Sequence, residues 1–400
     1  MKILIVSQYF WPEEFILNDL AIDLVDRGHD VTVLTGIPNY PKGKFYDGYG
    51  FKFAIENYRG IKIYRVPIIP RGNNSIMLII NYISFVLTGS FFALFHKKKY
   101  DKIFAVIFSP ITAVYPAIVY KKRHNTKLYL WVQDLWPESV SAAGKVKSNF
   151  IQIFLTKIVE NIYKNSDKVL VQSEAFIESI KKKGVTEYQL GYIPNWAEDL
   201  FSDTTKTSVR KFQNIIPVGF KIMFAGNLGE AQDFESIIKA AELTKHFPDI
   251  IWVIIGEGRK KGWIECEISR LGLQKTVFLL GRYPKEDMPS FFIHADMMLL
   301  SLKDEEIFSR TIPAKLQAYM AFGKPIIGIL NGTGADIIRR AECGYIANAG
   351  DFRKLAENAI NAYKEESNIL IEMGIKGKKY YIQNFSKKLI IDNLIQIFQE

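Results

Sequence analysis

The chain contains few of the residues that disulfide frameworks and metal sites require. Among its 400 residues there are 2 cysteines and 5 histidines. Cys266 and Cys343 are too few for a disulfide framework and lack metal-ligand spacing, so we expect two thiols in a reducing compartment. The histidines show no metal-ligand or catalytic-triad spacing either. We therefore predict no bound metal and no other cofactor.

The first residues lack the features of a signal peptide. Met1–Val6 has no charged segment followed by an apolar core and a small-residue cleavage site, and its pattern predicts a first β-strand instead. We therefore expect the protein to stay in the cytoplasm. With 48% hydrophobic and 24% charged residues, the chain is typical of globular proteins. Its length favours two domains of about 200 residues each.

Acidic residues are outnumbered by basic ones. The 52 Lys and Arg against 42 Asp and Glu give a formal net charge of +10. Such a charge favours an acidic partner, which can be nucleic acid, anionic lipid or a phosphorylated small molecule. We expect no nucleic acid, because the chain has no basic stripe interleaved with aromatic residues and no known nucleic-acid-binding module.

One stretch of the chain, 76–95, carries no charge, and His96 and three lysines follow it directly. Its length is just sufficient to span a bilayer. We favour a helix that dips partly into the membrane interface over a wholly buried core helix. Both are favoured over a true span, because a span would split one sheet across the bilayer. In the first case the lysines face anionic headgroups, and a solvated basic face is the alternative.

Short apolar, β-branched runs alternate with helical segments along most of the chain, as in parallel sheets covered on both faces. A polar segment, 199–217, separates two such sets and is the predicted linker. The predicted fold class is α/β, with two Rossmann-like domains facing each other across a cleft, 1–198 and 199–379. Sheets of this kind bind ligands at the carboxyl ends of their strands. The predicted strands are 3–6, 30–34, 61–64, 102–108, 127–132 and 168–172 in the first half, and 220–225, 250–255, 276–280, 297–301, 325–329 and 344–346 in the second.

Two glycine-containing turns follow strands of the second half. In the first turn, Gly226, Asn227, Gly229 and Gln232 lead from a strand into a helix, where backbone amides and the helix dipole favour a phosphate. A tight turn without a ligand is the alternative. The second turn, with Gly256 and Gly258, mimics a dinucleotide fingerprint. Its final spacing is wrong and charged residues occupy the approach to a pyrophosphate, so an NAD site is disfavoured.

A third segment opens a helix with hydroxyls and cations. Ser309, Arg310, Thr311 and Lys315 precede or begin a helix that ends at a Gly-Lys-Pro sequence. The two cations can meet a diphosphate at such a helix start. Solvated cations at a helix terminus are the alternative.

Two acidic and aromatic segments follow strands of the first half. Asp134 and Glu138 come directly after the strand at 127–132, where carboxylates are well placed to hold sugar hydroxyls. Asp134 as the cap of the next helix is an equal alternative. The loop after the first strand has the same character and is predicted to form the opposite wall of the cleft. It contributes Tyr9, Phe10, Trp11, Glu13 and Glu14.

Taken together, these segments resemble glycosyltransferase family 4, the retaining enzymes with the GT-B fold, over nearly the whole chain. Within that family the sequence is most similar to bacterial transferases of O-antigen and capsule synthesis that handle N-acetyl-L-fucosamine or related deoxy sugars. The segments that carry the resemblance are 8–13, 28–31, 134–139, 193–196, 226–229, 256–258, 281–284, 313–316 and 323–325.

The resemblance implies that the carboxyl-terminal domain binds a UDP-sugar and the amino-terminal domain binds the acceptor. Arg282 and Tyr283 would then contact the uracil, and the final helix within 380–400 would cross back to complete the first domain. Many relatives bind ribose through a Glu at the position of Ala318, so we expect Gln317 to supply that contact.

A second departure from the family concerns the diphosphate. Many relatives grip it with an Arg and a Lys at the positions of Asn227 and Gln232. We expect Arg310 and Lys315 to replace those cations here.

The resemblance also implies a mechanism and a setting. Retaining enzymes of this type need no protein nucleophile, because the departing β-phosphate oxygen can take the acceptor's proton. We assign catalytic roles to Arg310 and Lys315 on the donor and to Asp134 on a substrate hydroxyl. The expected acceptor is a saccharide on a polyprenyl diphosphate, at the inner face of the plasma membrane. The alternative is a UDP-sugar 2-epimerase, which shares the architecture and acts on the donor without an acceptor.

Overall fold

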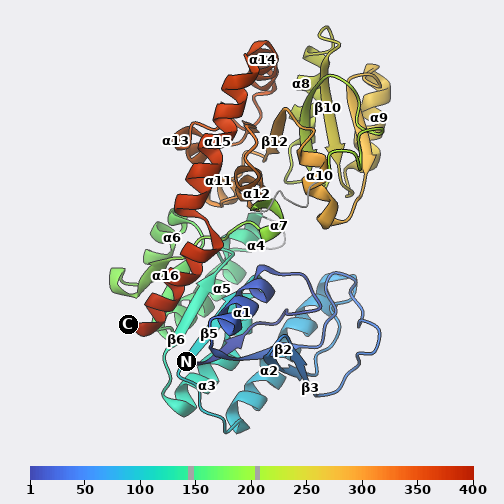
Figure 1. Cartoon of the computed structure of the whole chain (residues 1–400). Helices are drawn as coiled ribbons and strands as arrows, with labels where there is room; N and C mark the ends of the chain where they lie inside the picture. The colour runs from blue at the N-terminus through green and yellow to red at the C-terminus, as the bar shows by residue number, and fades with distance from the viewer. Residues whose placement is uncertain (143–147, 203–207) are drawn as a thin grey trace. The chain divides into compact units, whose positions relative to one another are not determined.

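The computed structural model describes residues 1–142, 148–202 and 208–400. The chain forms two compact units, one of Met1–Pro194 with Ile391–Glu400 and one of Asn195–Ile390 (Figure 1). The division falls at Pro194, where the sequence suggested residue 198. Of the final segment predicted to return to the first domain, only Ile391–Glu400 belongs to that unit.

The first unit is built on an eight-stranded sheet with strand order β3-β4-β2-β1-β5-β6-β7-β8. All neighbouring strands are parallel except β3 and β4, which are antiparallel. The order places β1, β2, β5 and β6 in the middle of the sheet, so the loops after these strands share one edge. The strands are β1 (Lys2–Val6), β2 (Asp30–Gly36), β3 (Ala54–Tyr58), β4 (Ile61–Val66), β5 (Lys102–Ile107), β6 (Leu128–Val132), β7 (Lys168–Val171) and β8 (Leu190–Tyr192).

Helices cover this sheet because their apolar residues recur at helical spacing. In α1 (Ile16–Asp26), Leu17, Leu20, Ala21 and Leu24 are buried, which is the i, i+3, i+4, i+7 pattern of one helix face. The other helices of this unit are α2 (Ser75–Phe95), α3 (Tyr115–His124), α4 (Glu138–Ala142), α5 (Asn149–Lys164), α6 (Ile177–Lys181) and the end of α16 (Lys387–Gln399).

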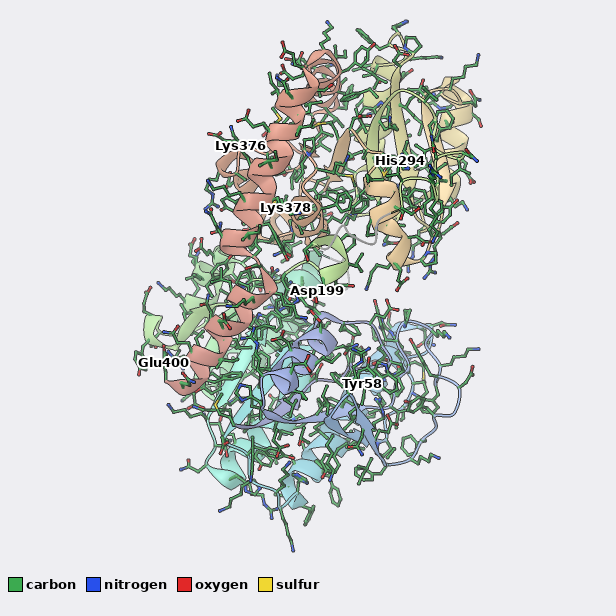
Figure 2. All side chains as sticks on the ribbon, viewed as in Figure 1. Tyr58, Asp199, His294, Lys376, Lys378 and Glu400 are labelled. Atoms are coloured by element: carbon green, nitrogen blue, oxygen red, sulfur yellow. The ribbon has the colours of Figure 1, made fainter. Side chains whose placement is uncertain are left out.

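The end of α16 is fixed in the first unit by aromatic packing and by a terminal ion pair. The ring of Phe398 meets those of Phe104 and Tyr129 edge-on, with centroids 5.5 Å and 4.9 Å away. Glu400, labelled in Figure 2, lies 3.0 Å from the Nζ of Lys168. The last residues therefore contribute apolar surface to the core of the first sheet.

The second unit is built on a six-stranded, fully parallel sheet with strand order β11-β10-β9-β12-β13-β14. One apolar cluster lies on each face of this sheet. The strands are β9 (Phe220–Ala225), β10 (Ile250–Ile255), β11 (Val277–Gly281), β12 (Met297–Ser301), β13 (Ile326–Ile329) and β14 (Gly344–Ala347). The helices are α7 (Asp199–Ser202), α8 (Phe234–Leu243), α9 (Lys261–Leu271), α10 (Met288–Phe292), α11 (Glu306–Arg310), α12 (Ala314–Phe322), α13 (Thr333–Arg340), α14 (Phe352–Lys364) and α15 (Ser367–Asn384), and α16 begins here.

All twelve strands expected from the sequence are present, and two further strands, β3 and β8, were missed. β3 lies at the sheet edge, and its Ile55 is 54% exposed. β8 has only three residues and none of them is buried. The predicted linker also differs from the structure, because Phe201 and Ile216 lie in the core of the second unit. Residues 203–207 of that linker lie outside the described residues.

The uncharged stretch forms α2, which has one buried face and one exposed apolar face. Phe85 and Ala93 are buried, while Leu87 and Phe91 are 64% and 67% exposed. Only 22% of the most apolar 18-residue window of α2 is buried. The alternative of a wholly buried core helix is therefore wrong.

The inner face of α2 belongs to the first unit. A Cβ at Gly89 would lie 2.8 Å from Pro116, so α2 and α3 are in close contact. Strands β4 and β5, which α2 connects, hydrogen-bond into the same sheet. Of the helices that the structure describes, α2 is the one whose length and hydropathy would allow it to cross a membrane. Its contacts are those of a helix that covers a sheet.

Glu13 ties the loop after β1 to the loop after β2. Its Oε1 accepts hydrogen bonds from the backbone N–H groups of Asn39, at 2.8 Å, and Tyr40, at 2.7 Å. The Glu13 side chain is 1% exposed. Burial raises the pKa of this carboxyl to about 7, although the backbone donors favour its charged form.

This raised pKa predicts a pH-dependent stability. A carboxyl that holds its proton more tightly when folded stabilises the protein fully at about pH 4 and below, and this contribution is lost as the pH rises through about 7. The contribution is of order 3 kcal/mol. We expect Glu13→Gln to keep the acceptor for Asn39 and to flatten the dependence of the urea midpoint between pH 5 and pH 8. Glu14→Gln, at an exposed position, should leave the profile as in the wild type, and a Glu13→Gln profile as steep as the wild type would contradict the assignment.

Candidate functional site

On the nucleotide side, the structure brings together three residues that the sequence placed in separate motifs. Gly226 follows β9 with a φ of +146°, and a Cβ there would lie 2.6 Å from the Cε of Lys315. The Nζ of Lys315 donates to the Oε1 of Gln232 at 2.6 Å and lies 3.8 Å from the centre of the Phe224 ring. The turn after β9 and the start of α12 therefore share one small volume within the second unit.

Lys315 has no acidic partner in this volume. No carboxylate of a described residue forms an ion pair with it, and its polar contact is the neutral amide oxygen of Gln232. Burial lowers the pKa of Lys315 to about 7. A crowded ammonium group that lacks a counter-ion favours an anion nearby.

Two neighbouring lysines, which the sequence analysis did not select, are already paired. Lys260 bonds Glu235 at 2.6 Å and lies 3.3 Å from Glu230, and Lys303 lies 3.3 Å from the same Glu230 carboxylate. Lys260 follows Gly256 and Gly258 and is one of the charged residues that argued against a dinucleotide site there. The pairing could not have been read from the sequence, because it joins three separate loops.

Gly256 and Gly258 allow the turn after β10 to pack closely against the turn after β9. A Cβ at Gly256 would lie 1.8 Å from the carbonyl oxygen of Gly226, and one at Gly258 would lie 2.3 Å from that of Leu228. The two turns are also joined by backbone hydrogen bonds, among them Leu228 to Glu257 at 2.9 Å. Both positions therefore require glycine for packing, and the ligand contact predicted for their backbone stays a prediction.

The hydroxyls of Ser309 and Thr311 are also used within the protein. They donate to the carbonyl oxygens of Glu306 and Ile307, both at 2.8 Å, and so cap α11, a helix that the sequence did not predict. A hydroxyl has one hydrogen to donate, so neither can also donate to a phosphate in this state. Arg310 is ion-paired with Glu306, one helical turn before it. A role for Arg310 on a diphosphate requires that it leave this carboxylate.

The ribose contact predicted for Gln317 is not available in this structure. The side chain is fully buried, and its amide donates to the backbone carbonyl of Asn195. Tyr283, predicted to contact uracil, packs against Phe212 and Phe291 with ring centroids 5.3 Å and 4.7 Å away.

Three remaining residues of the predicted donor side lie at the surface or against one another. Arg282 and Asn227 are exposed. A Cβ at Gly229 would lie 2.8 Å from the Asn227 amide, so that turn is tight. The uracil contact of Arg282 stays a prediction.

On the acceptor side, Asp134 follows β6 and is largely buried. Its carboxylate makes no hydrogen bond or ion pair with any described residue, so it does not cap a helix there. Burial alone raises the pKa of Asp134 to about 6. The carboxylate is therefore mostly charged at neutral pH and has acceptor capacity to offer to a substrate hydroxyl.

Tyr82 is a residue of this site that the sequence analysis missed. It lies on α2, and its hydroxyl interacts with those of Tyr9 and Ser109 and lies near the charge of Asp134. Burial raises the pKa of Tyr82. The sequence did not identify Tyr82 because the residue lies within the long uncharged stretch, whose pattern predicts an apolar helix.

Several residues predicted for the acceptor wall have structural roles. Phe10 is fully buried in the core, and Tyr9 is only 4% exposed. Trp11 stacks on Tyr58, labelled in Figure 2, with ring centroids 4.2 Å apart.

The acidic residues of that wall divide into one exposed and two engaged side chains. Glu14 is exposed, whereas Glu13 is the loop anchor described above. Glu138 accepts from Ser179 at 2.6 Å and from Lys183 at 2.5 Å. Glu13 is committed to the backbone of the neighbouring loop, so its acceptor role is corrected. Both contacts of Glu138 use Oε1, while its Oε2 is buried without a hydrogen-bond partner, so the acceptor role of Glu138 stays a prediction.

Comparisons with known proteins cover both units. A family model described as Glycosyltransferase Family 4 matches residues 14–198, and one described as Glycosyl transferases group 1 matches residues 206–380. The putative colanic acid biosynthesis glycosyl transferase WcaI of Escherichia coli is 26% identical over 339 residues, which are 81% of this chain and 82% of WcaI. The probable glycosyltransferase WbjE of Pseudomonas aeruginosa is 28% identical over 53% of each chain.

Solved structures share the fold over the whole chain. HepE of Anabaena, in complex with UDP and glucose, superposes with a TM-score of 0.69 and 17% identity, covering 100% of both chains. A glycosyltransferase from Rickettsia africae gives a TM-score of 0.71 at 14% identity, covering 100% of this chain and 97% of that one. The two parallel α/β units and these matches confirm the predicted GT-B fold. The chain is therefore a glycosyltransferase, whose first unit matches the Glycosyltransferase Family 4 model and whose second unit matches the group 1 model.

Proposed function

We propose that this enzyme transfers a sugar from a UDP-sugar to a lipid-linked saccharide acceptor during the synthesis of a bacterial surface polysaccharide. The observation that carries the donor assignment is Lys315, an ammonium group without a carboxylate partner at a phosphate-favouring turn. HepE, which shares the fold, was solved with UDP and glucose. WcaI, which aligns over most of the chain, is named for colanic acid biosynthesis.

The donor's diphosphate would supply the negative charge that Lys315 lacks. Gly226 has no side chain, so the backbone can approach a ligand there, and Gln232 holds the ammonium group in place. As the glycosidic C1–O bond breaks, negative charge grows on the leaving diphosphate, and a fixed cation stabilises it more in the transition state than before. Arg310 would join Lys315 after leaving Glu306.

The reaction would proceed with retention of configuration. The acceptor oxygen attacks C1 from the face that the diphosphate leaves, and its proton passes to the departing β-phosphate oxygen. Asp134 would hold a hydroxyl of one of the sugars, because it is an unpaired carboxylate at a strand end. The family resemblance favours an N-acetylated deoxyhexosamine such as N-acetyl-L-fucosamine as the sugar transferred.

We further propose that the first unit associates with an anionic membrane at the cytoplasmic face. The exposed side of α2 presents Ile76, Ile83, Leu87 and Phe91, all more than half exposed. They recur at the spacing of one helix face, and Lys97–Lys99 follow the helix end. An apolar stripe with flanking lysines is the composition of a helix that lies in a membrane interface.

A UDP-sugar 2-epimerase with the same fold is the alternative function. It would consume the donor in the absence of any acceptor and leave the sugar unattached. Product analysis with and without a lipid-linked saccharide separates the two functions.

The first prediction concerns Lys315. We expect Lys315→Met to reduce the affinity for UDP and to lower the rate of transfer about a hundredfold, as removal of one charged transition-state contact typically does. UDP at 100 times its dissociation constant stabilises a protein by about 2.7 kcal/mol, so a thermal shift reports the wild-type binding. Lys239→Met is the matched control, because the Nζ of Lys239 also lies over a ring, 5.2 Å from Phe352, on the exposed side of α8.

The same lysine predicts a pH dependence. The pKa of Lys315 is lowered to about 7 in the free protein, and a bound diphosphate raises it again. UDP affinity should therefore fall as the pH rises from 7 to 9 in the wild type and in Lys239→Met, and stay level in Lys315→Met. Parallel pH profiles in all three proteins would remove Lys315 from the donor site.

The second prediction concerns Asp134. Asp134→Asn keeps the shape but removes the charge, so kcat/KM for transfer should fall tenfold or more while UDP affinity stays as in the wild type. Because the pKa of Asp134 is raised to about 6, wild-type kcat/KM should rise with pH through that value and the variant should lack this step. Asp47→Asn, at an exposed position of the same unit, is the control. Full activity of Asp134→Asn would exclude the assignment.

The third prediction concerns α2. Each apolar side chain transferred from water contributes about 1.5–3 kcal/mol, so the pair Leu87→Glu and Phe91→Glu should reduce binding to phosphatidylglycerol vesicles more than tenfold. Vesicle flotation measures this. Ile371→Glu is the control, since Ile371 is 62% exposed in the second unit. Equal flotation of the double variant and the wild type would show that α2 does not meet the membrane.

A further inference from the structure

The loop between β4 and α2 holds an arginine that the predicted sites did not include. The Arg71 guanidinium lies over the Tyr40 ring, 4.9 Å from its centre, and the Arg71 backbone N–H donates to the Oδ1 of Asn39 at 3.0 Å. Among the described residues, no carboxylate forms an ion pair with Arg71. The side chain is partly buried. The side chain of Arg71 stacks on Tyr40, which leaves the donors of its guanidinium fork without a carboxylate among the described residues.

The loop that carries Arg71 lies against α2 next to Tyr82, because the Asn39 Oδ1 that accepts from the Arg71 N–H also accepts from the Nδ2 of Asn81, at 3.5 Å. The ring of Tyr40 lies 5.5 Å from that of Tyr9, and the Arg71 charge acts on the hydroxyls of both Tyr9 and Tyr82. Tyr82 also lies near Asp134, so Arg71 belongs to the same polar cluster as the acceptor-side carboxylate. Burial raises the pKa of Tyr9 and Tyr82, which keeps both phenols protonated and able to donate at neutral pH.

We propose that Arg71 and the Tyr82 hydroxyl bind the diphosphate of a lipid diphosphate on the acceptor side. A guanidinium presents a planar fork of donors that matches a phosphate, and a phenol adds one more donor. The site rests on the proposed function, since it gives the acceptor a place distinct from the donor's turn in the second unit. Asp134, in the same cluster, remains available for a sugar hydroxyl.

The position of Tyr82 on α2 is the reason for proposing a lipid as the ligand. The inner face of α2 carries Tyr82 and the buried Asn81, and its outer face is apolar and exposed. A groove of about 840 Å³ runs along the outer face and is lined by Phe53, Leu87, Phe91 and other apolar residues. One helix therefore places an apolar surface and a phosphate-binding cluster on the same unit, which suits a molecule with an isoprenoid tail and a charged head.

The test compares vesicles of phosphatidylcholine that carry a polyprenyl diphosphate with vesicles that carry the corresponding polyprenol. We expect the wild type to bind the diphosphate vesicles at least tenfold more tightly. Arg71→Gln should lose most of this preference and Tyr82→Phe should lose part of it. Arg123→Gln, which removes the same charge from an exposed site of α3, should keep it. Unchanged melting temperatures establish that the variants are folded.

Three outcomes would overturn the proposal. One is a diphosphate preference in Arg71→Gln equal to that of the wild type. Another is an equal loss by Arg71→Gln on phosphatidylglycerol vesicles, which would mean that Arg71 responds to membrane charge in general. The third is competition by free inorganic pyrophosphate at the concentration at which the lipid diphosphate binds, which would make the site one for a free anion.

Failure of this site and failure of the proposed function give different results. If UDP does not bind and Lys315→Met has no effect, the function fails while the diphosphate preference can still stand. If UDP binds and transfer occurs, but Arg71→Gln has a wild-type KM for the lipid-linked acceptor, the function stands and the Arg71 site fails.

Discussion

The turn after β9 is built around one ammonium group that no carboxylate of a described residue neutralises. Lys315 packs over Phe224 and against Gly226, and the neutral amide of Gln232 is its polar partner. Other lysines of the same region, such as Lys260, are neutralised by glutamates. Burying an unpaired charge is unfavourable, and this desolvation cost lowers the pKa of Lys315. An anion bound in the turn would raise the pKa of Lys315 again.

The turn around Lys315 is held by backbone contacts that leave little freedom. Gly256 and Gly258 allow the loop after β10 to lie directly against the loop after β9, with no room for side chains between them. The hydroxyls at the end of α11 are likewise committed to the protein backbone. A charge held in place by a rigid backbone is the arrangement that electrostatic stabilisation of a leaving group needs, because little reorganisation is then required during the reaction.

The first unit also contains charged side chains that form no ion pair with a described residue. Asp134 and Arg71 carry opposite charges in one polar cluster, and neither forms an ion pair with a described residue. Tyr82 on α2 feels both charges and is a neutral donor. Because α2 also presents an apolar outer face, the unit joins polar recognition to an apolar surface through a single helix.

The sequence was sufficient for the architecture, and it brought Gly226, Gln232 and Lys315 into consideration before the structure showed them together. Strands such as β1 and β10 are recognisable because their apolar residues are consecutive along the chain, and the turns after them are recognisable from their glycines. The edge strand β3 escaped detection because two of its five residues are exposed and none is fully buried. Tyr82 was not predicted as a site residue because nothing in the neighbouring sequence distinguishes it from the apolar residues of the same helix.

By itself, the sequence determined the order of the elements, the two-unit division and the residue types at each strand end, since these follow from local patterns. Only the tertiary structure decided which polar side chains remain available. The Oε1 of Glu138 is taken by Lys183, Gln317 by the backbone of Asn195, and Glu13 by that of Asn39, all far away in the chain. The availability of a charge depends on what lies beside it in space, and folding brings residues together whose separation along the sequence carries no signal of the contact.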